Sequence, residues 1–207
     1  MRLVLASTSP ARLALLRAAG IEPEATPPGV DEEAAVAAEE ARRGEPLAPE
    51  DLVLLLARLK AEAVAAGLVG EDALVLGGDS AFAFDGRLFG KPHTAEAALA
   101  RWRAQRGRSG VLHSGQWLID ARTGEGDGVV TAAAVHFAAD LDDDELVAYV
   151  ASGEPLAVAG AFTIDGLAGP FIDRVDGDPS TVVGLSLPAL RRLVRSTGTA
   201  WPALWNR

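Results

Sequence analysis

One candidate catalytic residue, Asp79, follows directly on a segment that should be buried. Residues 73–76 are all apolar, which predicts a central strand, and Gly77 and Gly78 separate this strand from Asp79. A carboxylate just past the end of a central strand, after glycines that permit close approach, is typical of metal or substrate chemistry. The alternative is that Asp79 only caps a turn.

A second group of carboxylates lies nearer the start of the chain. Asp31, Glu32 and Glu33 begin an alanine-rich segment that has the composition of a helix. Acidic residues in a first helical turn complement the helix dipole, so one interpretation is helix capping. The other is that one of these carboxylates reaches a metal or a ligand.

A turn near the N-terminus has the residues of an anion-binding site. The apolar residues 3–6 predict a strand, and Ser7, Thr8 and Ser9 supply hydroxyls. Ser9 is also placed to cap a helix that ends at Gly20. Arg12 lies in the first helical turn, where acidic residues are usual. Hydroxyls, free amides and one arginine suit a phosphate. Alternatively, the hydroxyls merely close the turn and Arg12 is solvated.

Only two of the 19 basic residues are lysines, Lys60 and Lys91. Lys60 follows the apolar stripe of a helix predicted at 52–66, so it should lie at the edge of the buried face. Lys91 stands between a glycine and Pro92. Each lysine could serve as a compact ammonium for a ligand, or could be there by chance in a composition that favours arginine.

Composition narrows the class of protein. The 207 residues suit one domain, perhaps of two lobes, and the formal charge of −10 argues against binding duplex nucleic acid. An anionic ligand would therefore need a locally positive pocket. The absence of cysteine excludes disulfides and thiolate nucleophiles. No apolar run approaches 18 residues, so we expect a cytoplasmic protein without a membrane partner.

The alternation of elements predicts an α/β fold with a mixed sheet. The residues Asp85 and Gly86 are typical of a type I′ hairpin turn. Further strands are predicted at 111–120, 129–138 and 171–175, and further helices at 94–105, 142–152 and 188–195.

Several of these pieces occur together as ordered motifs over about 190 residues. They are Leu-Ala-Ser-x-Ser-Pro-x-Arg (5–12), Val-Asp-Glu (30–32), Lys60, Gly-Asp-Ser (78–80), Gly-Lys-Pro (90–92), Ser-Gly-Glu-Pro (152–155), Ala-Gly-Ala-Phe (159–162) and Val-Val-Gly-Leu (182–185). In the order and content of these motifs, the chain resembles the Maf family of nucleoside triphosphate pyrophosphatases, also called septum formation inhibitor proteins.

The resemblance implies one Maf-like domain over 1–207, with 199–207 as a tail. It implies an elongated fold of two lobes, with a central mixed sheet and a substrate cleft, similar to ITP pyrophosphatases. The implied reaction converts a nucleoside triphosphate, canonical or modified, to the monophosphate and pyrophosphate with Mg²⁺ or Mn²⁺. The implied partner is the nucleotide, and a homodimer is the oligomeric state to test.

The resemblance also assigns roles to individual residues. Asp79 would be the proton acceptor, and Glu32 would assist the metal or the water, so that both are candidate metal ligands. The triphosphate would be bound by Ser7, Arg12, Lys60 and Lys91.

This chain departs from the family pattern at three places. Ala11 replaces a frequent second arginine, Val158 replaces a lysine, and Asp165 stands where the family commonly has glutamine. An ionised aspartate only accepts hydrogen bonds. At a pocket wall, Asp165 would favour a base edge rich in N–H donors, such as that of guanine or cytosine. The alternative is that Asp165 caps the turn at Gly166.

Two other functions compete with pyrophosphatase activity. One is a nucleotide-binding regulator of cell division without turnover, which would not need both Asp79 and Glu32. The other is a phosphatase that releases single phosphates, for which the sequence lacks a motif that forms a covalent phospho-enzyme.

Overall fold

The computed structural model describes residues 1–206 and has an α/β fold built on one mixed, seven-stranded sheet. The strand order is β2-β1-β3-β5-β6-β7, and β4 pairs with β3. β1 pairs in parallel with β2 and β3, whereas the β3–β4 and β6–β7 pairs are antiparallel. The predicted fold class, an α/β protein with a mixed sheet, is confirmed. The strands are β1 (Arg2–Ala6), β2 (Glu24–Ala25), β3 (Ala73–Phe84), β4 (Arg87–Phe89), β5 (Ser109–Asp120), β6 (Gly126–Phe137) and β7 (Ile172–Asp176).

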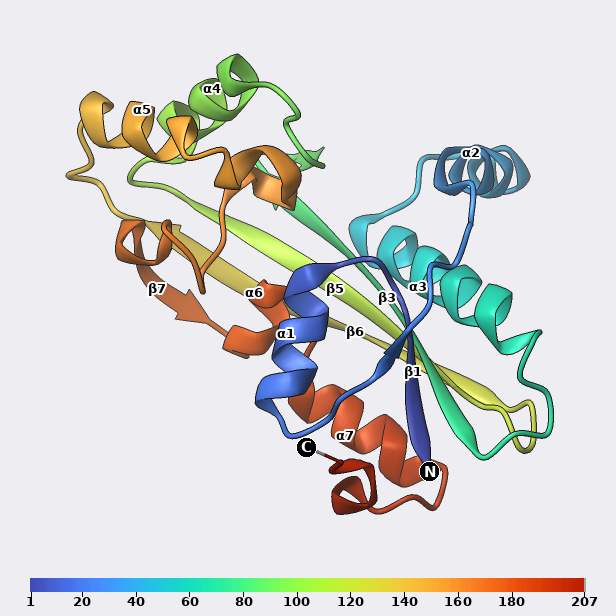
Figure 1. Cartoon of the computed structure of the whole chain (residues 1–207). Helices are drawn as coiled ribbons and strands as arrows, with labels where there is room; N and C mark the ends of the chain where they lie inside the picture. Colours follow the sequence, from blue (N-terminus) through green and yellow to red (C-terminus); the bar gives the residue numbers. More distant parts are fainter. Residues whose placement is uncertain (207) are drawn as a thin grey trace. The chain divides into compact units, whose positions relative to one another are not determined.

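Helices flank the sheet (Figure 1). The α-helices within residues 1–206 are α1 (Pro10–Ala18), α2 (Glu32–Arg43), α3 (Pro49–Ala65), α4 (Ala95–Gln105), α5 (Asp143–Ala151), α6 (Pro179–Val183) and α7 (Leu187–Ser196). Short 3₁₀ turns are η1 (Glu154–Ala157), η2 (Ala159–Ala161), η3 (Gly169–Phe171) and η4 (Trp201–Leu204). None of the helices in the described part of the chain is long and apolar enough to cross a membrane.

The chain divides into two compact units. The first unit consists of residues 1–79, 114–131 and those from Gly184 onward, and the second consists of Ser80–His113 and Ala132–Val183. The boundary falls within β3, directly after Asp79. The prediction of a single domain over the whole chain stays a prediction.

The core of the first unit follows from the alternation of side chains along β1 and β3. Leu3 and Leu5 of β1 face the same side as Leu16 of α1 and Leu190 of α7. Their neighbours along β1 face the other side, where Ala61 lies on α3. Figure 1 shows this arrangement, with α1 and α7 on one face of the strands and α3 on the other. Burial on both faces explains why these strands are continuous apolar runs.

Glycines let α3 approach the sheet closely. A Cβ at Gly77 of β3 would overlap the Ala57 carbonyl oxygen and lie 2.8 Å from the Ala61 amide nitrogen. A Cβ at Gly115 of β5 would likewise overlap the Val53 carbonyl. The helix backbone thus rests on the strand backbone at these two glycines.

The second unit has an aromatic core. Phe82 and Phe137 meet edge to face at 6.0 Å between ring centroids, and Trp102 contacts Phe137 and Tyr149 at 5.4 and 5.2 Å. The indole N–H of Trp102 donates to the Ala161 carbonyl at 2.7 Å, so this buried N–H has a hydrogen-bond partner.

Local signals in the sequence are confirmed in both units. Asp85 and Gly86 have φ values of 53° and 71°, as a type I′ turn between β3 and β4 requires. Asp142 and Glu145 form a capping box at the start of α5, so this acidic run caps its helix as expected.

The structure corrects one prediction of local structure and adds one helix that was not predicted. β3 does not end before Gly77 but continues to Phe84, so Asp79 lies within a strand rather than past its end. The paired glycines reflect close contacts on both faces of the strand, of Gly77 with α3 and of Gly78 with the Arg12 side chain, not a strand terminus. In addition, the structure contains the short helix α6, which was not predicted from the sequence, and at its start Asp178 accepts hydrogen bonds from the amide and hydroxyl of Ser180.

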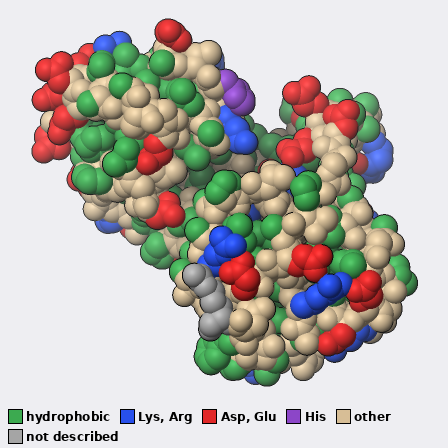
Figure 2. All heavy atoms as spheres, in the orientation of Figure 1, with side chains coloured by type: hydrophobic (Ala, Val, Ile, Leu, Met, Phe, Trp, Pro, Cys, Tyr) green, Lys and Arg blue, Asp and Glu red, His purple; other side chains and the backbone are tan. Residues whose placement is uncertain are grey.

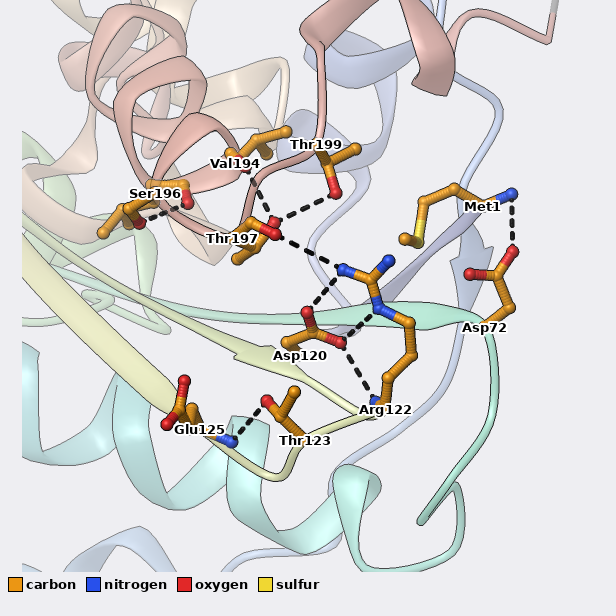
Figure 3. Close-up of polar contacts among 11 residues, drawn as sticks. Met1, Asp72, Asp120, Arg122, Thr123, Glu125, Val194, Ser196, Thr197 and Thr199 are labelled. Carbon is orange, nitrogen blue, oxygen red and sulfur yellow. Dashed lines mark hydrogen bonds and ion pairs between the residues drawn. The ribbon is translucent and has the colours of Figure 1, made fainter.

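A partly buried ion pair joins the β5–β6 turn to the end of α7 (Figure 3). The Asp120 carboxylate, whose side chain is 6% exposed, accepts hydrogen bonds from the Arg122 amide at 3.0 Å and from its guanidinium at 2.8 and 2.5 Å. Arg122 also donates to the Thr197 carbonyl at 3.5 Å. The hydrogen bonds from Arg122 lower the pKa of Asp120.

We expect Arg122→Ala to lower the melting temperature by a few degrees at pH 7, because a buried carboxylate loses its partner. A carboxyl group with a depressed pKa contributes stability above its unfolded pKa of about 3.9 and loses it as the pH falls through the folded value. The loss should therefore shrink in acid. Thermal melts of the variant and of exposed Arg192→Ala at pH 7 and about 3 would check this. A deficit that persists in acid would contradict it.

Candidate active site

The first element of the site is the turn between β1 and α1. The Ser9 hydroxyl oxygen accepts from the Arg12 amide at 3.4 Å, which caps α1, and the Ser7 hydroxyl oxygen accepts from the Ser9 amide at 3.1 Å. The Arg12 side chain is buried rather than solvated, which rules out the second of the two interpretations of this residue. The predicted strand, turn and capped helix are confirmed.

Arg12 is held by one partner close to it in sequence and by one distant segment of the chain. Its Nε donates to the Gly184 carbonyl at 2.8 Å, and its Nη1 donates to the Ser7 hydroxyl at 3.3 Å. A Cβ at Gly78 would lie 3.1 Å from Arg12 Nε, so the guanidinium rests against the backbone of β3. Burial lowers the pKa of Arg12, and the charges of Asp79 and Glu32 oppose this shift.

Lys60 brings the two candidate carboxylates together. Its Nζ lies 2.7 Å from Asp79 Oδ1 and 2.8 Å from Glu32 Oε1. The three residues come from α3, β3 and the first position of α2, and Asp31 caps α2 through the Ala34 amide. Asp31 therefore caps the helix, as the first interpretation expected, and Glu32 contacts Lys60. That Glu32 binds a metal or a ligand stays a prediction.

The side chains of Lys60, Asp79 and Glu32, which form one charged cluster, are buried to different extents. The side chains of Lys60 and Asp79 are 9% and 16% exposed, whereas that of Glu32 is 49% exposed. Burial raises the pKa of Asp79 above its ordinary value, although the positive charges of Lys60 and Arg12 act in the opposite direction. The site thus combines two cations with two carboxylates at the edge of a buried region.

The donor set of this cluster fits a magnesium-type ion. Within residues 1–206, no group of three or more histidine, cysteine or acidic side chains could hold a metal alone. Mg²⁺, however, is usually bound through one or two carboxylates, with substrate phosphates and waters completing its shell. Asp79 and Glu32 already converge on one cation, the Lys60 ammonium.

Lys91 and Asp165 belong to the second unit. Both are exposed, and their placement beside the first-unit residues stays a prediction. In the described chain the Asp165 side chain makes no hydrogen bond or ion pair. The Gly166 amide instead donates to the Thr163 carbonyl at 3.4 Å, so Asp165 does not cap this turn.

Glu154 organises the loop that carries Asp165, and sequence reasoning assigned it no role. Its carboxylate accepts from the Tyr149 hydroxyl and from the Leu167 amide, both at 3.0 Å, and from the Thr163 hydroxyl. Its place in the Ser-Gly-Glu-Pro motif was the available signal. Thr163, two residues before Asp165, supplies one of these donors.

We expect Glu154→Ala to loosen this loop and to cost about 1–3 kcal/mol of stability, because three donors lose their acceptor. Amide hydrogen exchange over residues 163–168 should accelerate, while exchange in the first unit should stay unchanged. The measurement is exchange followed by mass spectrometry, with exposed Glu96→Ala as the control. Unaltered protection of the loop would contradict the role given to Glu154.

A separate pocket of about 510 Å³ in the first unit is not lined by the candidate site residues Lys60, Asp79 and Glu32. It is lined by Leu118, Asp120, Thr123, Glu125, Gly126, Asp127, Leu193, Ser196 and Thr197. Ala121 pairs with Ala73 at that end of the sheet, through a 3.0 Å hydrogen bond. Asp79 lies further along β3, about 20 Å from Ala73 at the usual rise per residue.

Comparison with known proteins shows the family of this chain. Residues 2–197 match the family described as Maf-like protein. Three similar proteins are each named nucleoside triphosphate pyrophosphatase. The protein of Leifsonia xyli subsp. xyli is 68% identical, and the alignment covers 98% of its length. The protein of Salinispora tropica is 53% identical over 88% of its length. The protein of Streptomyces coelicolor is 51% identical over 94% of its length. These alignments span 100%, 100% and 99% of the present chain. The chain belongs to the Maf-like protein family.

Proposed function

We propose that this chain is a nucleoside triphosphate pyrophosphatase, which hydrolyses its substrate to the nucleoside monophosphate and pyrophosphate. The observation that carries the proposal is the convergence of Lys60, Asp79 and Glu32 beside a buried Arg12. The names of relatives that are up to 68% identical over the whole chain support the same activity.

Local positive charge is the first requirement for a triphosphate ligand. The chain has a formal charge of −10, and acidic side chains are spread over the face that Figure 2 shows. Arg12, Lys60 and the positive end of the α1 helix dipole provide cationic and dipolar groups against this background. With Ser7 and the second-unit Lys91, they are the proposed triphosphate ligands.

Asp79 and Glu32 are the proposed ligands of a divalent cation, Mg²⁺ or Mn²⁺. When bound, such an ion neutralises charge on phosphate oxygens and so lowers the barrier to attack at phosphorus. Arg12 holds phosphate oxygens from a fixed position, because Gly184 and Ser7 orient its guanidinium. Catalysis of phosphoryl transfer depends mainly on such positioning and charge stabilisation.

Asp79 is the proposed proton acceptor for the attacking water. Its burial raises its pKa, which is the direction that makes a carboxylate a stronger base. The Lys60 ammonium donates a hydrogen bond to one of the two carboxylate oxygens of Asp79, Oδ1. Water that attacks the α-phosphate would give the monophosphate and pyrophosphate, the products of the proposed reaction.

Product analysis tests this function directly. The protein is incubated with each common nucleoside triphosphate and Mg²⁺, and the products are separated by ion-exchange chromatography. Monophosphate plus pyrophosphate supports the proposal. Diphosphate plus phosphate would indicate a phosphatase, and binding without turnover would indicate a regulator.

Base preference is proposed to depend on Asp165. An exposed, unpaired carboxylate on the second unit can accept from the N–H donors of guanine or cytosine but repels a carbonyl. Asp165→Gln should shift the ratio of specificity constants toward UTP and dTTP by about ten-fold, or about 1.4 kcal/mol. Specificity constants for all common triphosphates would be measured, with exposed Asp173→Gln as the control. An unchanged ranking would remove Asp165 from base recognition.

A further inference from the structure

We propose that Lys60 occupies the cation position of the active site until a divalent metal binds. Metal binding then displaces the ammonium from Asp79 and Glu32 and makes it available to the triphosphate. Lys60 would thus couple metal binding to nucleotide binding. This inference rests on the function proposed above, in which Asp79 and Glu32 are metal ligands.

The first argument is geometric. One ammonium lies between carboxylates from two elements, 2.7 Å from Asp79 Oδ1 and 2.8 Å from Glu32 Oε1. A divalent cation bound to both carboxylates would take the same position between them. Two cations cannot share it at contact distance without strong repulsion. Lys60 must therefore move when the metal enters.

The second argument is the charge count. The ammonium contributes one positive charge against two carboxylates, so the cluster keeps a net charge of about −1. A divalent ion in its place would neutralise both carboxylates and release the ammonium. The released charge, together with Arg12, is what an anionic triphosphate requires.

The third argument concerns which groups can move. Lys60 has a long, flexible stem, although its backbone is fixed because α3 rests on the glycines of β3 and β5. Glu32 begins α2, a helix in which no residue is buried. The glycines Gly29 and Gly44 flank this helix with φ values of 63° and 78°. Both Lys60 and Glu32 can thus rearrange without disturbing the core.

Coupling follows from these points. If the metal displaces the ammonium, a triphosphate that receives the ammonium makes metal binding easier, and the metal makes triphosphate binding easier by the same factor. The free enzyme would hold metal weakly, because Lys60 competes for both ligands.

The wild-type protein allows a direct test, because it contains only two lysines. Protein labelled with ¹³C at the lysine ε-carbons gives two lysine signals, which Lys91→Arg assigns. Titration with Mg²⁺ alone should shift the Lys60 signal and leave the exposed Lys91 signal in place. A Lys60 signal that stays unchanged while Mg²⁺ saturates the protein, as shown by competition with Mn²⁺, would overturn the proposal.

A second measurement uses Mn²⁺ binding, followed by the electron paramagnetic resonance of the free ion without nucleotide. Lys60→Met should bind Mn²⁺ about ten-fold more tightly than wild type, since a competing cation is lost. Arg58→Met removes one positive charge from the exposed face of the same helix, where Arg58 pairs with Glu62, and is the matched control.

Two further variants test whether Lys60 competes with the metal. Lys60→Gln should reproduce the tighter binding if Lys60→Met does not fold, and Asp79→Asn added to either should abolish the gain. Equal gains for Lys60→Met and Arg58→Met, or no gain in a folded variant, would overturn the proposal. Product analysis of the wild-type enzyme is independent of these assays, so failure of the proposed function would be recognised separately.

Discussion

Asp79→Asn is expected to lower kcat for triphosphate cleavage by about 10²-fold or more, the range for a lost acid–base group. Asparagine has the shape of aspartate but can neither accept a proton from water nor hold a metal with a full negative charge. The expected loss is therefore in turnover, measured with the best nucleotide of the panel at saturating Mg²⁺.

The variant should fold, although for a reason that only the structure supplies. Asp79 lies within β3, and its side chain is 16% exposed beside Lys60, so asparagine can keep the strand and the site's packing. Lys60 retains Glu32 as a charged partner at 2.8 Å. Circular dichroism and thermal melts would check that the fold is intact.

Asp72→Asn is the matched control. Asp72 directly precedes the same strand, is 66% exposed and pairs with the N-terminal amine. The Asp72→Asn substitution removes one negative charge next to the same strand without changing the site. It should leave kcat within two-fold of wild type. Near-normal turnover by a folded Asp79→Asn protein would remove Asp79 from the mechanism.

The residues of the site could be found from the sequence because each stands at a local signal. Asp79 follows paired glycines, Glu32 begins a helix, and Ser9 with Pro10 marks the start of α1. The structure places Glu32, Lys60 and Asp79 in contact, as expected for a common site. Their catalytic roles, and those of Lys91 and Asp165, stay predictions.

Contacts between distant segments could not be found in this way. Arg12 donates to the Gly184 carbonyl, 172 residues away, and nothing in either local pattern specifies that pair. The continuation of β3 through Gly77 and Gly78 was missed for a related reason. Glycine is a weak strand former by itself, but here a helix packed on the strand requires the absence of a side chain.

Gly77→Ala tests whether this close packing positions the site. An added Cβ would overlap the Ala57 carbonyl oxygen and lie 2.8 Å from the Ala61 amide nitrogen. Both are backbone atoms of α3, so no side chain can rotate away, and the helix itself must shift. We expect a loss of about 3 kcal/mol or more in the free energy of unfolding, measured by urea denaturation.

The same substitution should impair catalysis beyond the loss of folded protein. Lys60 lies between Ala57 and the end of α3, and a shift of that helix would draw its ammonium away from Asp79 and Glu32. Activity per folded molecule should therefore fall by about 10-fold or more, since small displacements at a catalytic site are costly. Gly67→Ala is the control, because a Cβ there meets only ordinary contact at 3.7 Å. If Gly77→Ala melts and turns over like Gly67→Ala, the contact between α3 and β3 does not position Lys60.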